Sequence, residues 1–242
     1  MTRQRHRGKN PEDERFFTPN KMPTLKKAVE DLSYLYTRNY SEKAAIKIVG
    51  DHYQLKDRQR IAVQLATCSD LSLYNRHKSE AGNKSLKGYT FLIDGYNLLI
   101  TIESLLSGGI LICGRDKCIR DIASLHGSYH KVEETIPALK WIGENLSAYE
   151  PSHVQWFLDK PISNSKRLAQ LLKDLSNEYG WTWDAEVVDN PDAIIVSQEG
   201  IVISSDSWIL DRTNIWLNFV YRCIKSRMND FWILDFSESS TN

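Results

Sequence analysis

Apolar residues near the start of the chain recur at spacings of three and four positions, which is the period of an amphipathic helix. The first such run contains Leu25, Val29, Leu32 and Tyr36. A second helix is predicted after Ser41 and a third after Asp57, because both residue types favour the N-cap position. We therefore expect a small all-α domain over residues 21–85, preceded by a basic arm over residues 1–20. A polar segment with two glycines, residues 79–88, is predicted to link this domain to the rest of the chain.

Beyond this linker, short apolar runs alternate with helical patterns. Strands are predicted at residues 89–93, 154–158, 183–188 and 201–204. Helices are predicted at residues 97–106, 119–125, 132–148 and 165–179 and from residue 192 onward, with a bend at Pro137 and an irregular segment at residues 110–113. The alternation of strands and helices predicts a mainly parallel, doubly wound α/β sheet over residues 86–242.

Aspartates follow the predicted strands of this region at the positions where the strands end. They are Asp94, Asp159, Asp189 with nearby Asp192, and Asp206. Any single one is explained as the N-cap of the next helix. In an open α/β sheet, however, ligands bind beyond the carboxyl ends of the strands, and carboxylates gathered there repel each other unless a cation lies among them. Hard oxygen ligands suit Mg²⁺ or Mn²⁺, which can stabilise the in-line displacement at a phosphodiester, so the pattern predicts a metal site.

The charges of the chain are distributed unevenly although the formal net charge is zero. Residues 1–88 contain 18 Lys and Arg against 10 Asp and Glu, whereas residues 89–242 contain 13 against 21. A basic half beside an acidic half is typical of a protein that attracts a polyanion. The residues expected to contact phosphates are Arg3, Arg5, Arg7, Lys56, Arg58 and Arg60. The alternative is that the basic cluster at residues 56–60 forms an ordinary solvated surface.

Two segments resemble the motifs of NYN-type PIN-like nucleases. The sequence FLIDGYNLL, from Phe91 to Leu99, has an apolar strand followed by Asp-Gly-x-Asn. The sequence from Asp189 to Asp206 has an acid that opens a short helix, then a glycine, an apolar strand and Ser-Asp. The resemblance implies a PIN-like fold in which the metal is bound by acids at the strand ends. The helical amino-terminal part is similar to that of an uncharacterised prokaryotic family in which such a domain precedes a PIN-like one.

The resemblance also implies roles for individual residues. Catalytic metal ligands are expected at Asp94, Asp192 and Asp206, with a further ligand at Asp189, and supporting roles at Asn97, Ser205, Asp121 and Asp159. PIN domains often have another acid between the first two strands. Asp116 and Asp121 are the candidates here, and Arg120-Asp121 favours Asp121. Asp159 precedes Lys160-Pro161, so shaping that turn is the alternative role for its side chain.

The function implied is that of an Mg²⁺- or Mn²⁺-dependent endoribonuclease acting on single-stranded or loop RNA, where the choice of RNA rests on analogy alone. One alternative is a non-catalytic RNA-binding or interaction protein on the same fold. Another is a metal-dependent phosphatase, which would use the same carboxylates on monoesters. Trp208, just past Asp206, is a candidate for stacking on a nucleic-acid base. The oligomeric state is left open, a homo-oligomer included.

Other site types are less well supported by the sequence. Cys113 and Cys118 precede His126 and His130 at pair spacings near those of a zinc finger, but only seven residues separate the pairs, so buried thiols and surface histidines are the favoured interpretation. No Walker-type phosphate loop occurs. No apolar run approaches the roughly 18 residues of a membrane span. Four cysteines in a chain of 242 residues do not form a disulfide scaffold, so a cytoplasmic location without a membrane partner is expected.

Overall fold

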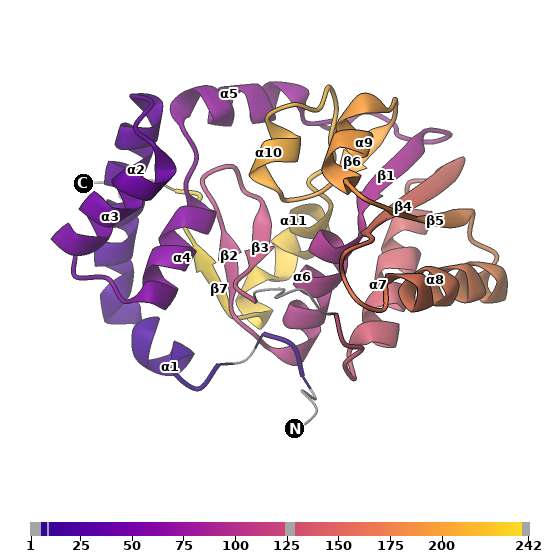
Figure 1. The fold of residues 1–242 in the computed structure, drawn as a ribbon, viewed down its shortest axis with the longest axis horizontal. Helices are drawn as coiled ribbons and strands as arrows, with labels where there is room; N and C mark the ends of the chain where they lie inside the picture. Colours follow the sequence, from indigo (N-terminus) through magenta and orange to yellow (C-terminus); the bar gives the residue numbers. More distant parts are fainter. Residues whose placement is uncertain (1–5, 9, 124–128, 239–242) are drawn as a thin grey trace.

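The computed structural model describes residues 6–8, 10–123 and 129–238 and shows a mixed α/β fold (Figure 1). Its main sheet has four parallel strands in the order β5-β4-β1-β6. Their bounds are β1 Thr90–Asp94, β4 His153–Asp159, β5 Trp183–Val188 and β6 Ile201–Ile203. The chain moves from β1 to one side through β4 and β5, then crosses to the other side of β1 to form β6. The predicted parallel sheet is therefore confirmed, and its strand order reverses beside β1.

Helices cover both faces of this sheet because successive strand residues point to opposite sides. Phe91 and Ile93 pack in one apolar cluster with side chains of α6 (Gly95–Ser107), α7 (Thr135–Ser147) and α8 (Ser165–Tyr179). Leu92, between them in β1, packs in another cluster with Ile195 and Ile209. These two residues come from the short helices α9 (Pro191–Ser197) and α10 (Ser207–Leu210). The central strand is thus buried on both faces, as its continuous apolar run from Phe91 to Ile93 requires.

A second, three-stranded sheet departs from the sequence prediction. It consists of β2 Leu111–Cys113, β3 Ile119–Asp121 and β7 Ile233–Asp235, in the order β3-β2-β7. The prediction of an irregular segment at 110–113 and of a helix beginning at 119 was wrong. Residue spacing alone favours a helix there, but Ile119 and Arg120 pair in antiparallel register with Cys113 and Ile112. Each of the two strands has only three residues, which is too short for residue spacing to distinguish a strand from a helix, so periodicity could not reveal this hairpin.

The amino-terminal region is helical, as predicted. It contains α1 Asp13–Phe16, η1 Pro19–Lys21, α2 Met22–Thr37, α3 Glu42–His52, α4 Asp57–Ala66 and α5 Asp70–Ser79. The Ser41 hydroxyl accepts a hydrogen bond from the Ala44 N–H at 3.4 Å, which confirms the predicted N-cap of α3. At α4 the N-cap is Lys56 rather than the predicted Asp57, and α5 was not predicted.

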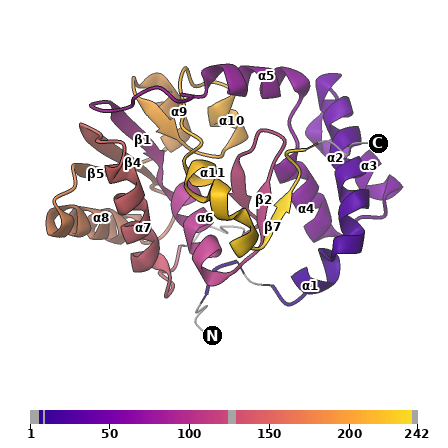
Figure 2. The same ribbon diagram turned by 180° about the vertical axis from the view of Figure 1, so that it is seen from behind.

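The apolar side chains of these helices do not form a cluster of their own. Leu25, Leu32 and Val63 share a buried cluster with Ile112 of β2 and Leu234 of β7. Helices α2, α3 and α4 accordingly lie beside the second sheet, on the side away from β4 and β5, whereas α5 runs across the top of the molecule, as seen from both directions in Figures 1 and 2. The amino-terminal region and the last strand of the chain therefore stabilise each other.

The remaining elements are the long helices α7 and α8 and the segment that leads from β6 to β7. Helix α8 has the predicted bounds, and α7 begins at Thr135, so Pro137 lies in its first turn and causes no bend within the helix. The Trp216 backbone pairs with Val202 of β6 and with Glu80, which extends the main sheet by two short segments. After α11 (Phe219–Ile224) and η2 (Lys225–Asp230) the chain returns to β7. Across the described ranges, no helix is long and apolar enough to cross a bilayer.

Candidate functional site

The acidic site begins at Asp94, the last residue of the central strand. Ile93 of β1 pairs with Ile203 of β6, so the parallel register sets Asp94 beside Ser204. The Ser204 hydroxyl donates a hydrogen bond to Asp94 Oδ2 at 2.8 Å and accepts one from the Asp206 N–H at 3.0 Å. Asp94 is 8% exposed. Its carboxylate is therefore held at the carboxyl edge of the sheet with one neutral hydrogen-bond donor and little contact with water.

The electrostatic surroundings of Asp94 disfavour its negative charge. Burial raises the pKa of Asp94 to about 7, and the carboxylates of Asp192, Asp206 and Asp159 act in the same direction, whereas the Ser204 hydrogen bond opposes it. Burial also raises the pKa of Asp192, as do the charges of Asp206 and Asp159. The structure thus brings together four of the predicted acids, from the ends of β1 and β4, from α9 and from the segment after β6.

Three of these acids can be compared with the alternative role of a helix N-cap. Asp94 precedes α6 but makes no capping hydrogen bond with its side chain. Asp192 lies inside α9, whose N-cap is Asn190, with Asn190 Oδ1 accepting from the Ala193 N–H at 3.1 Å. Asp206 does cap α10, because its Oδ1 accepts from the N–H groups of Trp208 and Ile209 at 2.7 and 3.1 Å. Capping therefore explains one carboxylate oxygen of Asp206. It does not explain the carboxylates of Asp94 and Asp192.

The residues of the Asp-Gly-x-Asn motif have separate physical tasks. A Cβ atom on Gly95 would lie 2.7 Å from the Phe157 carbonyl oxygen, so only glycine permits this close approach of α6 to β4. Asn97 Oδ1 accepts hydrogen bonds from both the N–H and the hydroxyl of Ser205, each at 2.9 Å. Asn97 therefore ties the start of α6 to the segment after β6, which contains Ser204 and Asp206.

Other predicted acids lie apart from this cluster. Asp189 is directed into solvent, with its side chain 78% exposed and 3.2 Å from Lys160 Nζ. Asp121, at the end of β3, accepts a hydrogen bond from the Thr101 hydroxyl at 3.2 Å, and burial raises its pKa to about 6. Asp121 belongs to the second sheet, and its partner Thr101 lies one helical turn after Asn97 in α6. Asp116, the other candidate for the additional acid, is buried between two arginines.

Of the four predicted phosphate-binding residues that the structure describes, three are engaged within the protein. Arg7 is 6% exposed, and its guanidinium donates to Glu103 Oε2 and to the His130 carbonyl oxygen, each at 2.8 Å. Arg58 forms a two-pronged ion pair with the buried Asp13, and Arg60 pairs with Asp51 at 2.7 Å. Lys56 is exposed. Arg3 and Arg5 lie outside the described residues.

The donor set at the acidic cluster consists of oxygen atoms, which suits a hard divalent cation. Within the described part of the chain, no group of three or more His, Cys, Asp or Glu side chains is placed so that it could hold a metal ion. Magnesium commonly uses one or two carboxylates, with water and substrate phosphate completing its shell, so the cluster fits an open site better than a closed cage.

Cys113 and Cys118, the cysteines with spacing near that of a zinc finger, do not fit a metal site. Cys113 and Cys118 are 0% and 1% exposed and belong to different apolar clusters, and burial raises the pKa of both thiols. His130 is exposed, and His126 lies outside the described residues. The cysteines agree with the interpretation of buried thiols.

Comparison with known proteins places the chain in a family. A family model described as "Domain of unknown function (DUF5616)" matches residues 83–222, which is more than half of the chain. The chain belongs to the DUF5616 family. A second model, "Protein of unknown function (DUF434)", matches residues 24–78. "Uncharacterized protein MJ0935" from Methanocaldococcus jannaschii is 30% identical over 192 residues, 79% of this chain and 91% of the relative. No solved structure is significantly similar to the chain.

The DUF5616 segment contains the whole acidic cluster, and the DUF434 segment ends within α5. The match to the archaeal relative is longer than the segment from residue 83 to the carboxyl terminus, so it extends into the helical region. Both parts therefore occur in one polypeptide in that relative as well.

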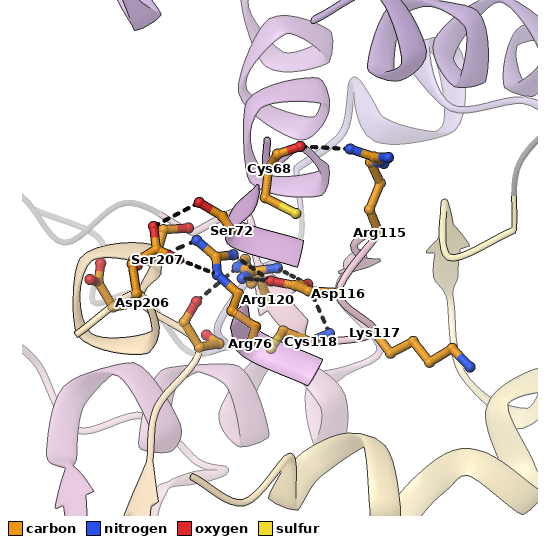
Figure 3. A network of polar contacts seen from close by, with 12 residues as sticks. Cys68, Ser72, Arg76, Arg115, Asp116, Lys117, Cys118, Arg120, Asp206 and Ser207 are labelled. Carbon is orange, nitrogen blue, oxygen red and sulfur yellow. Dashed lines mark hydrogen bonds and ion pairs between the residues drawn. The ribbon is translucent and has the colours of Figure 1, made fainter. Parts of the chain in front are cut away.

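Sequence reasoning missed several polar residues of this site. Ser204 is next to the predicted Ser205, and only the strand register shows that Ser204 rather than Ser205 contacts Asp94. Arg76 and Arg120 were also missed, although both contact the segment after β6 (Figure 3). A buried arginine cannot be distinguished from a surface arginine when nothing in the local sequence reports its partner.

Proposed function

We propose that this DUF5616 protein is a metal-dependent endoribonuclease of PIN-like fold, with a cation bound in an open site at the cluster of Asp94, Asp192, Asp206 and Asp159. The observation that carries the proposal is the buried Asp94 carboxylate, whose pKa is raised to about 7 by burial and by three neighbouring acids. A chain that gathers carboxylates without a cationic side chain among them needs a cation from solvent if these acids are to be ionised together.

The position of the cluster supports a ligand site. In open parallel α/β sheets, ligands bind outside the carboxyl ends of the strands where the strand order reverses. Here the order reverses between β1, which ends in Asp94, and β6, which leads to Ser204 and Asp206. The two motifs that carry the resemblance also meet in space, since Asn97 of the first binds Ser205 of the second. Both observations favour a PIN-like, doubly wound arrangement.

The residues of the chain have defined tasks in such a site. A bound Mg²⁺ or Mn²⁺ would neutralise the carboxylates and polarise a phosphodiester as a Lewis acid. Ser204 orients Asp94 through its 2.8 Å hydrogen bond, and Asn97 holds the segment that presents Asp206. Asp206 keeps one oxygen on the N–H groups of α10, which leaves Oδ2 for a ligand. Asp159 and Asp192 complete the negative field that attracts the cation.

Features near the cluster favour a polynucleotide over a small monoester. Trp208, two residues after Asp206, is 43% exposed, and the Arg212 guanidinium lies 4.3 Å from its ring centre. An exposed indole of this kind can stack on a base. A groove of about 470 Å³ beside Asp192 is lined by Lys160 and Lys166, with Val187 and Ile194 among its apolar residues. Its lysines can contact a phosphate backbone that leads to the acids.

The test is cleavage of a labelled mixed-sequence RNA by the purified protein with Mn²⁺, with Mg²⁺ or with EDTA. We expect cleavage only with metal, and a loss of about 100-fold or more in Asp94→Asn, because the variant lacks the central anionic ligand. Asp184→Asn is the matched control, since Asp184 is an acid of β5 that pairs with Lys173 at 3.0 Å away from the cluster. Its activity should equal that of the wild type.

Other outcomes discriminate the alternatives. Metal-independent RNA binding that persists in Asp94→Asn, without cleavage of any RNA or DNA, would contradict the enzyme and favour a binding protein. Hydrolysis of p-nitrophenyl phosphate without cleavage of oligonucleotides would favour a metal-dependent phosphatase.

A further inference from the structure

A second buried polar network lies next to the acidic cluster and joins three parts of the chain (Figure 3). Arg76 comes from α5, Asp116 and Arg120 come from the β2–β3 hairpin, and Asp211 follows α10. Arg76 donates to Asp116 Oδ2 at 2.6 Å and to Asp211 Oδ1 at 2.7 Å. Arg120 donates to both oxygens of Asp116, at 2.8 and 2.6 Å. Two guanidinium groups and two carboxylates thus form one continuous set of ion pairs.

The same two arginines hold the backbone that carries the acidic site. Arg120 Nε donates to the Ser205 carbonyl oxygen at 2.8 Å, and Arg76 Nη2 donates to the Ser207 carbonyl oxygen at 3.3 Å. These carbonyls flank Asp206 on both sides. The segment from Ser204 to Asp211, which we name the site loop, therefore rests on the arginines from one side and on Asn97 from the other.

The β2–β3 turn is itself fixed on the helical region. The Arg115 N–H donates to the Ala66 carbonyl oxygen at the end of α4 at 2.9 Å, and its guanidinium binds the Cys68 carbonyl oxygen at 2.7 Å. A Cβ atom on Gly114 would lie 2.8 Å from Arg120 Nη1, so the turn passes too close to the network for a side chain. Contacts therefore run without a break from α4 and α5, through the turn, to the site loop.

Burial makes this network rigid rather than adaptable. Arg76, Asp116 and Arg120 are 2%, 2% and 5% exposed. Loss of Asp116 would remove the carboxylate that both buried guanidinium groups share, so the set strongly favours a single arrangement. A guanidinium that binds Asp116, Asp211 and the Ser207 carbonyl together also requires the planar fork of arginine, which lysine does not have.

We propose that Arg76 is a positioning residue of the acidic site, through which the helical region matched by the DUF434 model completes the site of the DUF5616 segment. Its role is to set the site loop, and so the carboxylate of Asp206 and the hydroxyl of Ser204, against Asp94. This assignment rests on the proposed nuclease function for its consequence in catalysis, but the positioning of the loop is measurable without any substrate. It gives the helical region a structural task at the site in place of the RNA attraction expected from its basic charge.

The experiment compares Arg76→Lys with Arg58→Lys in the full-length protein. Both residues are arginines of the helical region that pair with a buried aspartate. The Arg58 guanidinium is engaged by Asp13 rather than presented to a phosphate, and neither residue contacts the site loop in the described structure. Hydrogen exchange followed by mass spectrometry measures the protection of residues 204–211. We expect exchange in this segment to rise about tenfold in Arg76→Lys and to stay at the wild-type rate in Arg58→Lys, with β1 and β4 unchanged in both.

A second measurement separates positioning from general stability. With labelled RNA and Mn²⁺, Arg76→Lys should lower kcat about tenfold with KM within about twofold, because the loop is misplaced while the substrate surface remains. Arg58→Lys should leave kcat and KM unchanged even if its melting temperature falls as much as that of Arg76→Lys. If Arg76→Lys does not fold, Asp211→Asn removes the partly exposed end of the same network and is expected to give the same two effects in weaker form.

The outcomes distinguish this inference from the proposed function. Unchanged exchange of the site loop in both Arg76→Lys and Asp211→Asn overturns the positioning role. Equal losses of kcat in Arg76→Lys and Arg58→Lys also overturn it, because the effect would then follow stability alone. Increased loop exchange in Arg76→Lys, in a protein whose wild-type form cleaves no RNA, supports the positioning role and overturns the nuclease.

Discussion

Asp94 and Asp116 are both buried aspartates, yet their surroundings drive their protonation in opposite directions. Asp94 is 8% exposed and Asp116 is 2% exposed. Burial and nearby acids raise the pKa of Asp94 to about 7. At Asp116 burial acts in the same sense, but the guanidinium groups of Arg120 and Arg76 outweigh it and hold the pKa well below its usual range. The neighbouring charges, rather than the degree of burial, decide the outcome.

The difference shows which of the two sites is complete within the chain. Asp116 has the cations it needs from Arg76 and Arg120, so its network is a structural unit. Asp94 has a serine hydroxyl and further carboxylates around it, so its cluster lacks positive charge. A buried carboxyl group among other acids is unfavourable unless a cation is near, and the divalent cation of the proposed function fits these oxygen donors.

The largest predicted effect is at Asp116. Asp116→Asn leaves two buried guanidinium groups without their shared carboxylate, so the free energy of unfolding should fall by about 3–5 kcal/mol. Urea denaturation followed by circular dichroism measures this change. Asp51→Asn, which removes an exposed partner of Arg60, is the control and should change stability little. A loss at Asp116 no larger than that at Asp51 would show that the network does not hold the fold.

The next largest effect is at Asp94, where substitution should increase the free energy of unfolding rather than lower it. Because the pKa of Asp94 in the folded protein is about 7, above its ordinary value of 3.8, the folded state retains a proton that the unfolded chain releases. Stability from this group is present below about pH 4 and is lost as the pH rises through about 7. Without metal, Asp94→Asn should therefore match the wild type near pH 4 and exceed its unfolding free energy at pH 8 by on the order of 2–4 kcal/mol.

Denaturation curves from pH 4 to pH 8 in EDTA measure this difference. Parallel pH profiles for wild type and Asp94→Asn would contradict the raised pKa of the Asp94 carboxyl group. Addition of Mn²⁺ at pH 8 should raise the melting temperature of the wild type and not that of the variant, because a ligand stabilises only the state that binds it.

The smallest effect concerns the open side of the acidic cluster. If Trp208 stacks on a base beside the metal site, Trp208→Ala should weaken binding of single-stranded RNA about fivefold to tenfold with little change in stability. Fluorescence anisotropy at fixed salt measures the affinity. Tyr74→Ala is the control, since Tyr74 is a 65% exposed aromatic residue on α5. Equal effects of the two substitutions would argue against a base platform next to Asp206.

Local patterns predicted those elements whose signals lie within one element. The leucine spacing of Ser165–Tyr179 predicted α8 with its bounds, and the apolar run before Asp94 predicted β1. The hairpin of β2 and β3 and the strand β7 were not predicted. Each of these strands has three residues; β2 and β7 pair across a long separation in sequence, as Leu111 does with Ile233, whereas β3 pairs with nearby β2 across a turn. Short strands of this kind depend on pairing more than on propensity.

The site divides in the same way. Asp94 and Asp206 were predicted because each follows an apolar strand, and Asn97 because its segment resembles the Asp-Gly-x-Asn motif of NYN-type nucleases. Asp189 follows a strand in the same manner, but its side chain turns toward Lys160 and solvent. Ser204 and Arg76 had no local signal at all, since each acts through a partner more than 100 residues away along the chain.

The sequence by itself determined the alternation of strands and helices, the helical amino-terminal region and the presence of acids where strands end. These properties follow from apolar periodicity and from turn and capping preferences, which act over a few neighbouring residues. Only the tertiary structure decided which acids meet, which arginines are buried with them and which region supports the site loop. Those outcomes depend on strand register and on the packing of distant segments, and burial then makes the energy of each charge depend on the neighbours it acquires.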